Sequence, residues 1–289
     1  MAANTRRVAV VTGASSGLGK ETAKAVVAQG WYVIAIGRDP GRSVAAEQEI
    51  RAACRDGKVD MIRANLALMA DAARVAQEIA ALTDRLDVLV NNAGGMAKER
   101  VITAEGYEEN FAGNHLGPFL LTIRLLPLLR HTAADAPRGS VRIINTSSIA
   151  GEWVKVLPWD DLQMLDNYDA GQAYCRSKLA NALFARGLAK RLAGDGIVAH
   201  SMHPGVVDTG FITHADESTQ AHIRTIPALT PEQGADTLIW LATAEEPGQS
   251  SGGYFYKRKP RAPNPLVDDD ACVERLWEES DKLVVKAGF

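Results

Sequence analysis

The sequence predicts a doubly wound α/β fold, a Rossmann fold in which helices cover both faces of a parallel sheet of about seven strands. Short β-branched runs alternate with alanine-rich amphipathic stretches along the whole 289-residue chain. The β-branched runs are almost continuously apolar, which is typical of strands buried on both faces of a parallel sheet. No linker, repeat or low-complexity segment interrupts this pattern, so residues 1–289 are expected to form a single domain.

Each expected element has its own signal. Strands are marked by β-branched and aliphatic runs, and helices by apolar residues at helical spacing. Gly30 ends the first helix, and Pro127 stands near the end of the longest, where it can kink the last turn. The expected strands are Arg7–Thr12, Trp31–Ile36, Lys58–Arg63, Leu86–Asn91, Val141–Thr146, Ile197–Met202 and Tyr254–Tyr256. The expected helices are Gly17–Gln29, Ser43–Arg55, Asp71–Thr83, Tyr107–Leu129, Ala173–Leu192 and Pro231–Thr243.

Two regions break the alternation, at residues 149–172 and 206–229. Both follow the carboxyl ends of expected strands, where folds of this class bind ligands. They are therefore interpreted as substrate loops, and a surface insertion is the alternative. The acidic run Asp268-Asp269-Asp270 is expected to lie at a helix N-terminus, where the helix dipole favours negative charge.

Composition disfavours several kinds of partner and site. The net charge of −3 gives no reason to expect nucleic-acid binding. Three widely spaced cysteines without a Cys-x-x-Cys pair argue against disulfides and structural zinc, and they favour a cytoplasmic setting. No apolar stretch approaches the roughly 20 residues of a spanning helix, so no membrane anchor is expected. His200 and His203 lack further ligands nearby in the sequence, so no metal site is expected either.

A glycine-rich loop follows the first expected strand and opens the first helix. It reads Thr12-Gly13-Ala14-Ser15-Ser16-Gly17-Leu18-Gly19. Glycines allow a sharp turn and a close approach to a pyrophosphate, and the helix N-terminus offers free N–H groups. The spacing differs from the common Gly-x-Gly-x2-Gly, but the position between strand and helix predicts a dinucleotide site. The expected contacts here are Gly13, Ser15, Ser16, Gly17, Leu18 and Gly19.

The end of the second strand indicates which dinucleotide binds. An acidic residue there would hold the ribose 2′-hydroxyl of NAD, whereas an arginine accommodates the 2′-phosphate of NADP. The strand ends Ile36-Gly37-Arg38-Asp39, so Gly37 occupies the acidic position and Arg38 follows it. NADP(H) is therefore the expected cofactor, with NAD(H) as the alternative. Asp39 is expected either to pair with Arg38 or to start the next helix.

A serine, a tyrosine and a lysine can form a reacting group. Tyr174 and Lys178 are four residues apart on an expected helix and share one face. A free tyrosine, with a pKa of about 10, is a poor base, but a nearby ammonium favours its phenolate. Tyr174 could then exchange a proton with a substrate oxygen that Ser148 holds by a hydrogen bond. Tyr168 is the rival tyrosine, but Gln172 stands where its lysine would be.

Taken in order, these motifs resemble the short-chain dehydrogenase/reductase family, and the likeness covers nearly the whole chain. It includes Asn91-Asn92-Ala93-Gly94, Ser147-Ser148, Tyr174-Cys175-Arg176-Ser177-Lys178, His203-Pro204-Gly205-Val206-Val207-Asp208-Thr209 and Leu276-Trp277-Glu278-Glu279-Ser280. Residues 114–122 and 177–181 are most similar to the retinol dehydrogenase and WW-domain oxidoreductase branch.

The resemblance implies roles for the matching residues. Asn114, Ser148, Tyr174 and Lys178 would be catalytic, with Asn114 supporting a water-linked proton relay to the lysine. Ser148 is preferred to Ser147 because the family motif places the active serine second. The implied cofactor contacts outside the glycine loop are Arg38, Asn65, Leu66, Asn92, Ala93, Gly94, Tyr174, Lys178, Pro204, Gly205, Val207 and Thr209. Asn65 replaces the usual aspartate of the family, which leaves its adenine contact open.

Apolar loop residues predict a lipophilic alcohol, ketone or aldehyde as substrate. The set is Trp153, Val154, Val156, Leu157, Trp159, Leu162, Met164, Val206, Phe211 and Ile212. Alternatively, these side chains pack the loops onto the domain or onto a partner subunit. The resemblance also suggests that the chain can form a homo-oligomer, with subunits that pair through the helices at residues 107–129 and 173–192.

Two other functions compete with an alcohol/carbonyl oxidoreductase. A catalytically silent NADP(H)-binding sensor or scaffold would be expected to lack Tyr174, Lys178 or Ser148, and all three are present. A sugar-nucleotide epimerase or dehydratase would be longer and would have a different glycine spacing.

Overall fold

A computed structural model describes residues 6–208, 220–221 and 225–289, and its sheet is the doubly wound sheet that the sequence predicts. The strand order is β3-β2-β1-β4-β5-β6-β7-β8. Strands β1 to β7 are parallel, and β8 is an antiparallel edge strand. The two-residue strand β8 is too short to have a sequence signal of its own. The strands are β1 Val8–Thr12, β2 Tyr32–Gly37, β3 Lys58–Arg63, β4 Val88–Asn91, β5 Arg142–Thr146, β6 Val198–Met202, β7 Tyr254–Tyr256 and β8 Lys259–Pro260.

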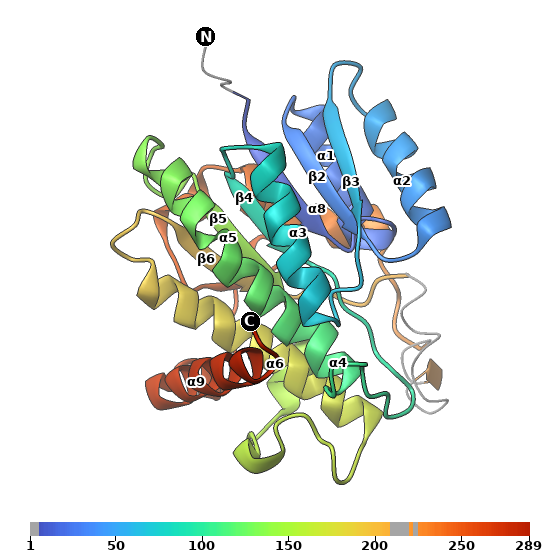
Figure 1. The fold of residues 1–289 in the computed structure, drawn as a ribbon, viewed down its shortest axis with the longest axis vertical. Helices are drawn as coiled ribbons and strands as arrows, with labels where there is room; N and C mark the ends of the chain where they lie inside the picture. Colours follow the sequence, from blue (N-terminus) through green and yellow to red (C-terminus); the bar gives the residue numbers. More distant parts are fainter. Residues whose placement is uncertain (1–5, 209–219, 222–224) are drawn as a thin grey trace.

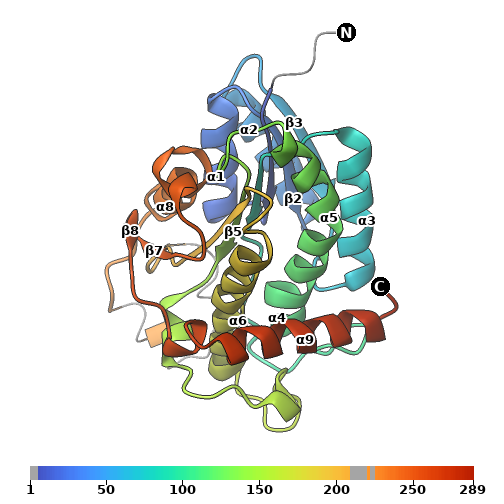
Figure 2. The ribbon, with the colours of Figure 1, turned by 90° about the vertical axis from the view of Figure 1, so that its left-hand side faces the viewer.

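Helices cover both faces of the sheet (Figures 1 and 2). One layer contains α1 Gly17–Ala28, α2 Pro40–Ala52 and α8 Pro231–Thr243. The other contains α3 Met69–Leu82, α5 Gly117–Ala134 and α6 Ala170–Arg191, with α9 Asp270–Lys286 packed against α6. Successive strand residues serve opposite layers, since Val10 joins the core beneath α5 and Val11 the core beneath α1. This alternation explains why the strands are apolar throughout.

The long helix predicted over about Tyr107–Leu129 is present, but it spans Glu109 to Ala134 and contains a π-helical turn. The segment begins with α4 Glu109–Phe111, passes through a π-helical turn at Ala112–Leu116 and continues as α5. In the turn, the Gly117 N–H donates to the Ala112 carbonyl five residues back. Pro118 has no N–H to offer the carbonyl of residue 114, so one α-helical hydrogen bond is absent where the turn joins α5. Pro127 does not end the helix, because α5 runs on to Ala134.

Aspartates cap three of the described helices, with Asp169 at the start of α6. Asp39 accepts a hydrogen bond from the Arg42 N–H at 2.8 Å and so caps α2, which decides between the two roles predicted for it. Asp269 caps α9 by accepting from the N–H groups of Ala271 and Cys272, as expected for this acidic run. Among the described residues, no helix is both long and apolar enough to cross a membrane.

Candidate active site

The candidate site lies at the carboxyl ends of β1 and β4, where the strand order reverses direction. The Thr12 hydroxyl, at the end of β1, accepts hydrogen bonds from the N–H groups of Asn92 and Ala93 at 2.9 and 2.8 Å. The Asn92 amide group donates in turn to the Thr12 carbonyl at 3.0 Å. These bonds fix the loop after β4 beside the glycine loop after β1, so two predicted cofactor motifs meet at one edge of the sheet.

The glycine loop forms a cradle that fits a dinucleotide. Gly13 has a φ of +69°, and a Cβ there would lie 2.9 Å from the Ala93 Cα atom. A Cβ on Gly19 would lie 2.3 Å from the Gly13 carbonyl oxygen, so the loop and α1 can approach this closely only with glycine. In α1, all of which is described, the first turn has no acidic residue and Ser16 makes no side-chain capping bond. The first N–H groups and the positive end of the helix dipole are therefore suited to a phosphate.

The end of β2 has a small residue for a steric reason. A Cβ on Gly37 would lie 2.5 Å from the Ser43 hydroxyl and 2.8 Å from the Ser15 Cβ atom. An acidic side chain at this position would therefore collide with the glycine loop. Arg38 is exposed, and its guanidinium lies 3.4 Å from a Glu109 carboxylate oxygen, so its ion pair is not the one with Asp39.

Only some of the other predicted cofactor residues lie at the same edge of the sheet. The Asn65 side-chain oxygen accepts from the Ala67 N–H at 3.3 Å, so it is used within its own turn. Leu66 is buried in the core. Pro204 and Gly205 follow β6, and Val207 bridges to Leu229 and faces Gly234 of α8. Thr209 and the loop residues Phe211 and Ile212 lie outside the described residues.

The structure brings Ser148, Tyr174 and Lys178 together. Ser148 follows β5 and is hydrogen-bonded to Tyr174 of α6. The Lys178 ammonium lies 5.6 Å from the centre of the Tyr174 ring and donates to the Thr146 carbonyl at 3.2 Å. Ser147 points the other way and donates to the Lys178 carbonyl at 2.6 Å, so it anchors α6 to the end of β5. The serine that faces the tyrosine is therefore the second of the pair.

Asn114 projects from the π-helical turn and is held on three sides. Its side-chain oxygen accepts from the Gly95 N–H at 2.8 Å, and its amide donates to the Gly95 carbonyl and the Ser177 hydroxyl at 2.9 Å each. Ser177 donates to the Tyr174 carbonyl at 2.8 Å. Asn114 thus joins the loop after β4 to the helix that contains Tyr174.

Burial perturbs both titratable groups of the site. It raises the pKa of Tyr174 to about 12, although the hydrogen bond with Ser148 lowers it in part. Burial lowers the pKa of Lys178 to about 8. Tyr174 is consequently a protonated phenol at neutral pH and Lys178 an ammonium, the states needed for proton donation to a carbonyl oxygen.

The apolar residues of the first loop divide into three groups, of which Trp159 and Met164 form the half-buried one. Val154, Leu157 and Leu162 are buried in the domain core, so for them the packing alternative holds. Trp153 and Val156 are 65% and 73% exposed and remain available to a ligand or partner. One of the two helices predicted to mediate pairing, α6, is covered on one side by α9 (Figure 2).

The two histidines of β6 and its following loop have partners within the protein. His200 contacts the Pro247 carbonyl at 2.9 Å and accepts from the Gly253 N–H at 3.2 Å. His203 accepts from the Gly205 N–H at 3.2 Å and stacks on the Tyr256 ring at 4.1 Å. Within the described ranges, no group of three or more His, Cys, Asp or Glu side chains could hold a metal ion.

Some residues of the site were not predicted from the sequence. Thr12 and Ser177 act through hydrogen bonds between loops that are far apart in the chain. Asn181, one turn after Lys178, donates to the same Thr146 carbonyl at 3.0 Å. Thr12 at the end of a strand and Asn181 three residues after the lysine could have been noticed, but their partners lie 81 and 35 residues away.

Gly94 provides a sharp test of this geometry. A Cβ there would lie 2.8 Å from the Asn114 side-chain oxygen and 3.1 Å from the Lys178 ammonium, and both groups are held by hydrogen bonds. We expect Gly94→Ala to lower turnover by roughly tenfold or more, because the methyl group displaces one of them. Gly95→Ala is the matched control, since a Cβ there meets no described atom within 4 Å. Equal kcat values for the two variants would contradict this arrangement.

Comparison with known proteins places the chain in a family. The profile of the family described as short chain dehydrogenase matches residues 7–220, and the chain belongs to this family of oxidoreductases. Retinol dehydrogenase 13 of Homo sapiens is 37% identical over 286 residues, which cover 96% of this chain and 84% of that protein. Polyprenol dehydrogenase of Mus musculus is 36% identical over 287 residues, covering 98% and 85%. These relatives confirm the resemblance to the retinol dehydrogenase branch.

Solved structures share the fold. A putative uncharacterized protein from Mycobacterium paratuberculosis superposes with a TM-score of 0.75 at 29% identity, covering 96% of this chain and 93% of that chain. The RhlG/NADP active-site complex of Pseudomonas aeruginosa gives a TM-score of 0.68 at 30% identity, covering 86% and 93%.

Proposed function

We propose that the protein is an NADP(H)-dependent oxidoreductase that interconverts an alcohol and a carbonyl group on a lipophilic small molecule. The observation that carries this proposal is the contact of Tyr174 with Ser148 above the buried ammonium of Lys178, at the edge of the sheet that holds the glycine cradle. A sensor or scaffold that only binds a cofactor would have no need of this costly buried charge.

The residues divide the chemistry among them. When bound, the nicotinamide cofactor supplies or accepts the hydride at the substrate carbon. Ser148 would hold the substrate oxygen, and Tyr174 would donate a proton to it in reduction or take one in oxidation. Lys178 would stabilise the phenolate that Tyr174 becomes after donation, and Asn114 would support the return of a proton toward Lys178.

The substrate class is proposed from the exposed apolar residues of the first loop and from the names of the relatives. Retinol and polyprenol, the alcohols in those names, are both lipophilic. The test is a panel of all-trans-retinal, aromatic aldehydes and polycyclic ketones with NADPH and NADH, followed by the corresponding alcohols with NADP⁺ and NAD⁺. Turnover of lipophilic members supports the proposal. Bound cofactor without turnover of any member would favour the silent sensor.

The preference for NADP(H) depends on Arg38. Its guanidinium is exposed at the end of β2, where an arginine could accommodate a 2′-phosphate, and the crowded Gly37 leaves no room for the acidic residue that NAD binders use. We expect Arg38→Asp to weaken NADPH binding by roughly tenfold to 100-fold and to change NADH binding little. Titration of cofactor fluorescence measures both. Arg55→Asp makes the same charge change on the turn after α2 and should alter neither; equal losses for both cofactors in Arg38→Asp would defeat the assignment.

A further inference from the structure

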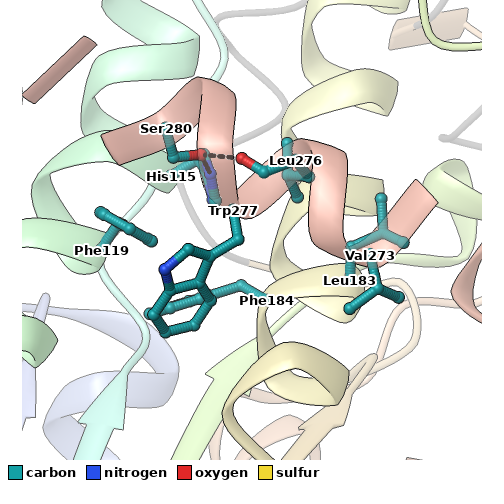
Figure 3. A pocket seen from close by; sticks show the side chains of 8 residues that line it. All are labelled: His115, Phe119, Leu183, Phe184, Val273, Leu276, Trp277 and Ser280. Atoms are coloured by element: carbon teal, nitrogen blue, oxygen red, sulfur yellow. Dashed lines mark hydrogen bonds between the residues drawn. The ribbon is translucent and has the colours of Figure 1, made fainter. Parts of the chain in front are cut away.

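A buried histidine stands next to Asn114 in the sequence and contacts the C-terminal helix α9. His115 belongs to the same π-helical turn and is 1% exposed. Its ring lies 5.1 Å from that of Phe111 and packs edge-on against Phe184 at 5.9 Å. Trp277 of α9 closes the group by contacting Phe119 and Phe184 (Figure 3).

The partner of His115 comes from the C-terminal helix. The His115 Nε2 atom lies 2.7 Å from the Ser280 hydroxyl of α9. The Ser280 hydroxyl also lies 2.7 Å from the Leu276 carbonyl oxygen, so its single proton can go to that oxygen or to His115 Nε2 (Figure 3). Burial lowers the pKa of His115 to about 3, with the Asn181 side chain opposing this shift, so the ring stays neutral at working pH.

The hydrogen bond between His115 and Ser280 lies in a region where the other contacts are apolar. The surrounding side chains, which include Leu183 and Val273, pack without room for a water molecule. Water therefore cannot replace the Ser280 hydroxyl, and loss of this hydroxyl would leave the buried His115 Nε2 atom unpaired. The Tyr107 hydroxyl makes a second bond between this region and α9, to the Leu283 carbonyl at 2.8 Å.

The geometry points to His115 and Ser280 as positioning residues for the reaction: α9, through the bond between them, fixes the π-helical turn that presents Asn114 to Gly95 and Ser177. A π-helical turn is rare and occurs mostly as a single-turn bulge within an α-helix, frequently at a functional site. Asn114 and His115 are consecutive in this turn, so a shift of the His115 ring also moves the Asn114 side chain. The inference rests on the proposed function only where it predicts a change in turnover; the structural support of the turn by α9 does not depend on it.

Ser280→Ala and His115→Phe break the bond from opposite ends. We expect each to lower kcat for retinal reduction by roughly tenfold while the KM for NADPH stays nearly unchanged, because Asn114 serves the proton step. In an Asn114→Ala background, Ser280→Ala should cause no further loss, since both act through the same residue. A loss of the same size in both backgrounds would overturn the inference.

Hydrogen exchange of the cofactor-free protein gives a readout that needs no turnover. Ser280→Ala should speed exchange of the Gly95 amide, which Asn114 holds, and of residues 112–117. Val273→Ala is the matched control: it removes buried apolar contact from the same part of α9 but no hydrogen bond, so it should lower thermal stability without this local effect. Equal exchange in the two variants would overturn the inference, even if the panel of carbonyl compounds found no substrate and the proposed function had failed.

Discussion

Tyr174→Phe should lower turnover by roughly 10²- to 10⁴-fold while NADPH binding persists, because the variant removes one hydroxyl and leaves the ring. The hydroxyl is the group that Ser148 contacts, and its pKa of about 12 keeps it protonated and ready to donate to a carbonyl oxygen. The ring itself packs against the core, so its apolar contacts survive the change. Steady-state kinetics with the best carbonyl of the panel, together with cofactor fluorescence, separates chemistry from binding.

Tyr168→Phe is the matched control for this experiment. The Tyr168 hydroxyl accepts from Asn110 and donates to the Ala97 carbonyl, at 2.7 and 2.9 Å, so it is used in structure. Its loss should reduce stability modestly and leave kcat within a few-fold of the wild type. Turnover retained in Tyr174→Phe, or lost equally in both variants, would refute the role given to Tyr174.

The strands of the sheet could be predicted because each one has a signal within its own few residues. Each parallel strand is an apolar run buried on both faces, so its position could be read without knowing its neighbours. The π-helical turn within residues 107–129 was not predicted, although Pro118 stands two residues after it, because the pattern of apolar residues continues through the turn. A helical periodicity reports which side chains are buried and is insensitive to one extra residue in a turn.

The candidate site was predictable where a motif and its partner share a short segment. Tyr174 and Lys178 lie on one helix face, and the glycine loop is a single strand-to-helix turn. Contacts between distant segments were not predictable from one sequence. Arg38 pairs with Glu109, 71 residues away, and His115 pairs with Ser280, 165 residues away. The sequence shows that these residues are polar, but the residues around each of them do not indicate which distant partner the fold brings close.

Lys178→Met should lower activity by roughly 10²- to 10⁴-fold and at the same time stabilise the cofactor-free protein. Without the ammonium, the hydrogen bond with Ser148 is left to favour the Tyr174 phenolate, so both proton donation and proton removal become harder. The Thr146 carbonyl loses one donor but keeps the Asn181 amide, so no buried acceptor is left unpaired. Lys282→Met, on the exposed face of α9, is the control and should change neither quantity.

The stability gain should depend on pH in a defined direction. The pKa of Lys178 is about 8 in the folded chain against 10.5 for the unfolded side chain, a gap worth about 3 kcal/mol. Below pH 8 both states are protonated, so folding of the wild type carries the full penalty of burying the charge. The penalty fades as the pH rises from 8 toward 10.5, because the folded state then releases its proton. Thermal unfolding of the cofactor-free proteins should therefore show Lys178→Met several degrees above the wild type at pH 7 and a smaller difference at pH 9.5. A variant less stable than the wild type at pH 7, or a difference that grows with pH, would mean that the lysine is not held as a buried, destabilised ammonium poised beside the phenol.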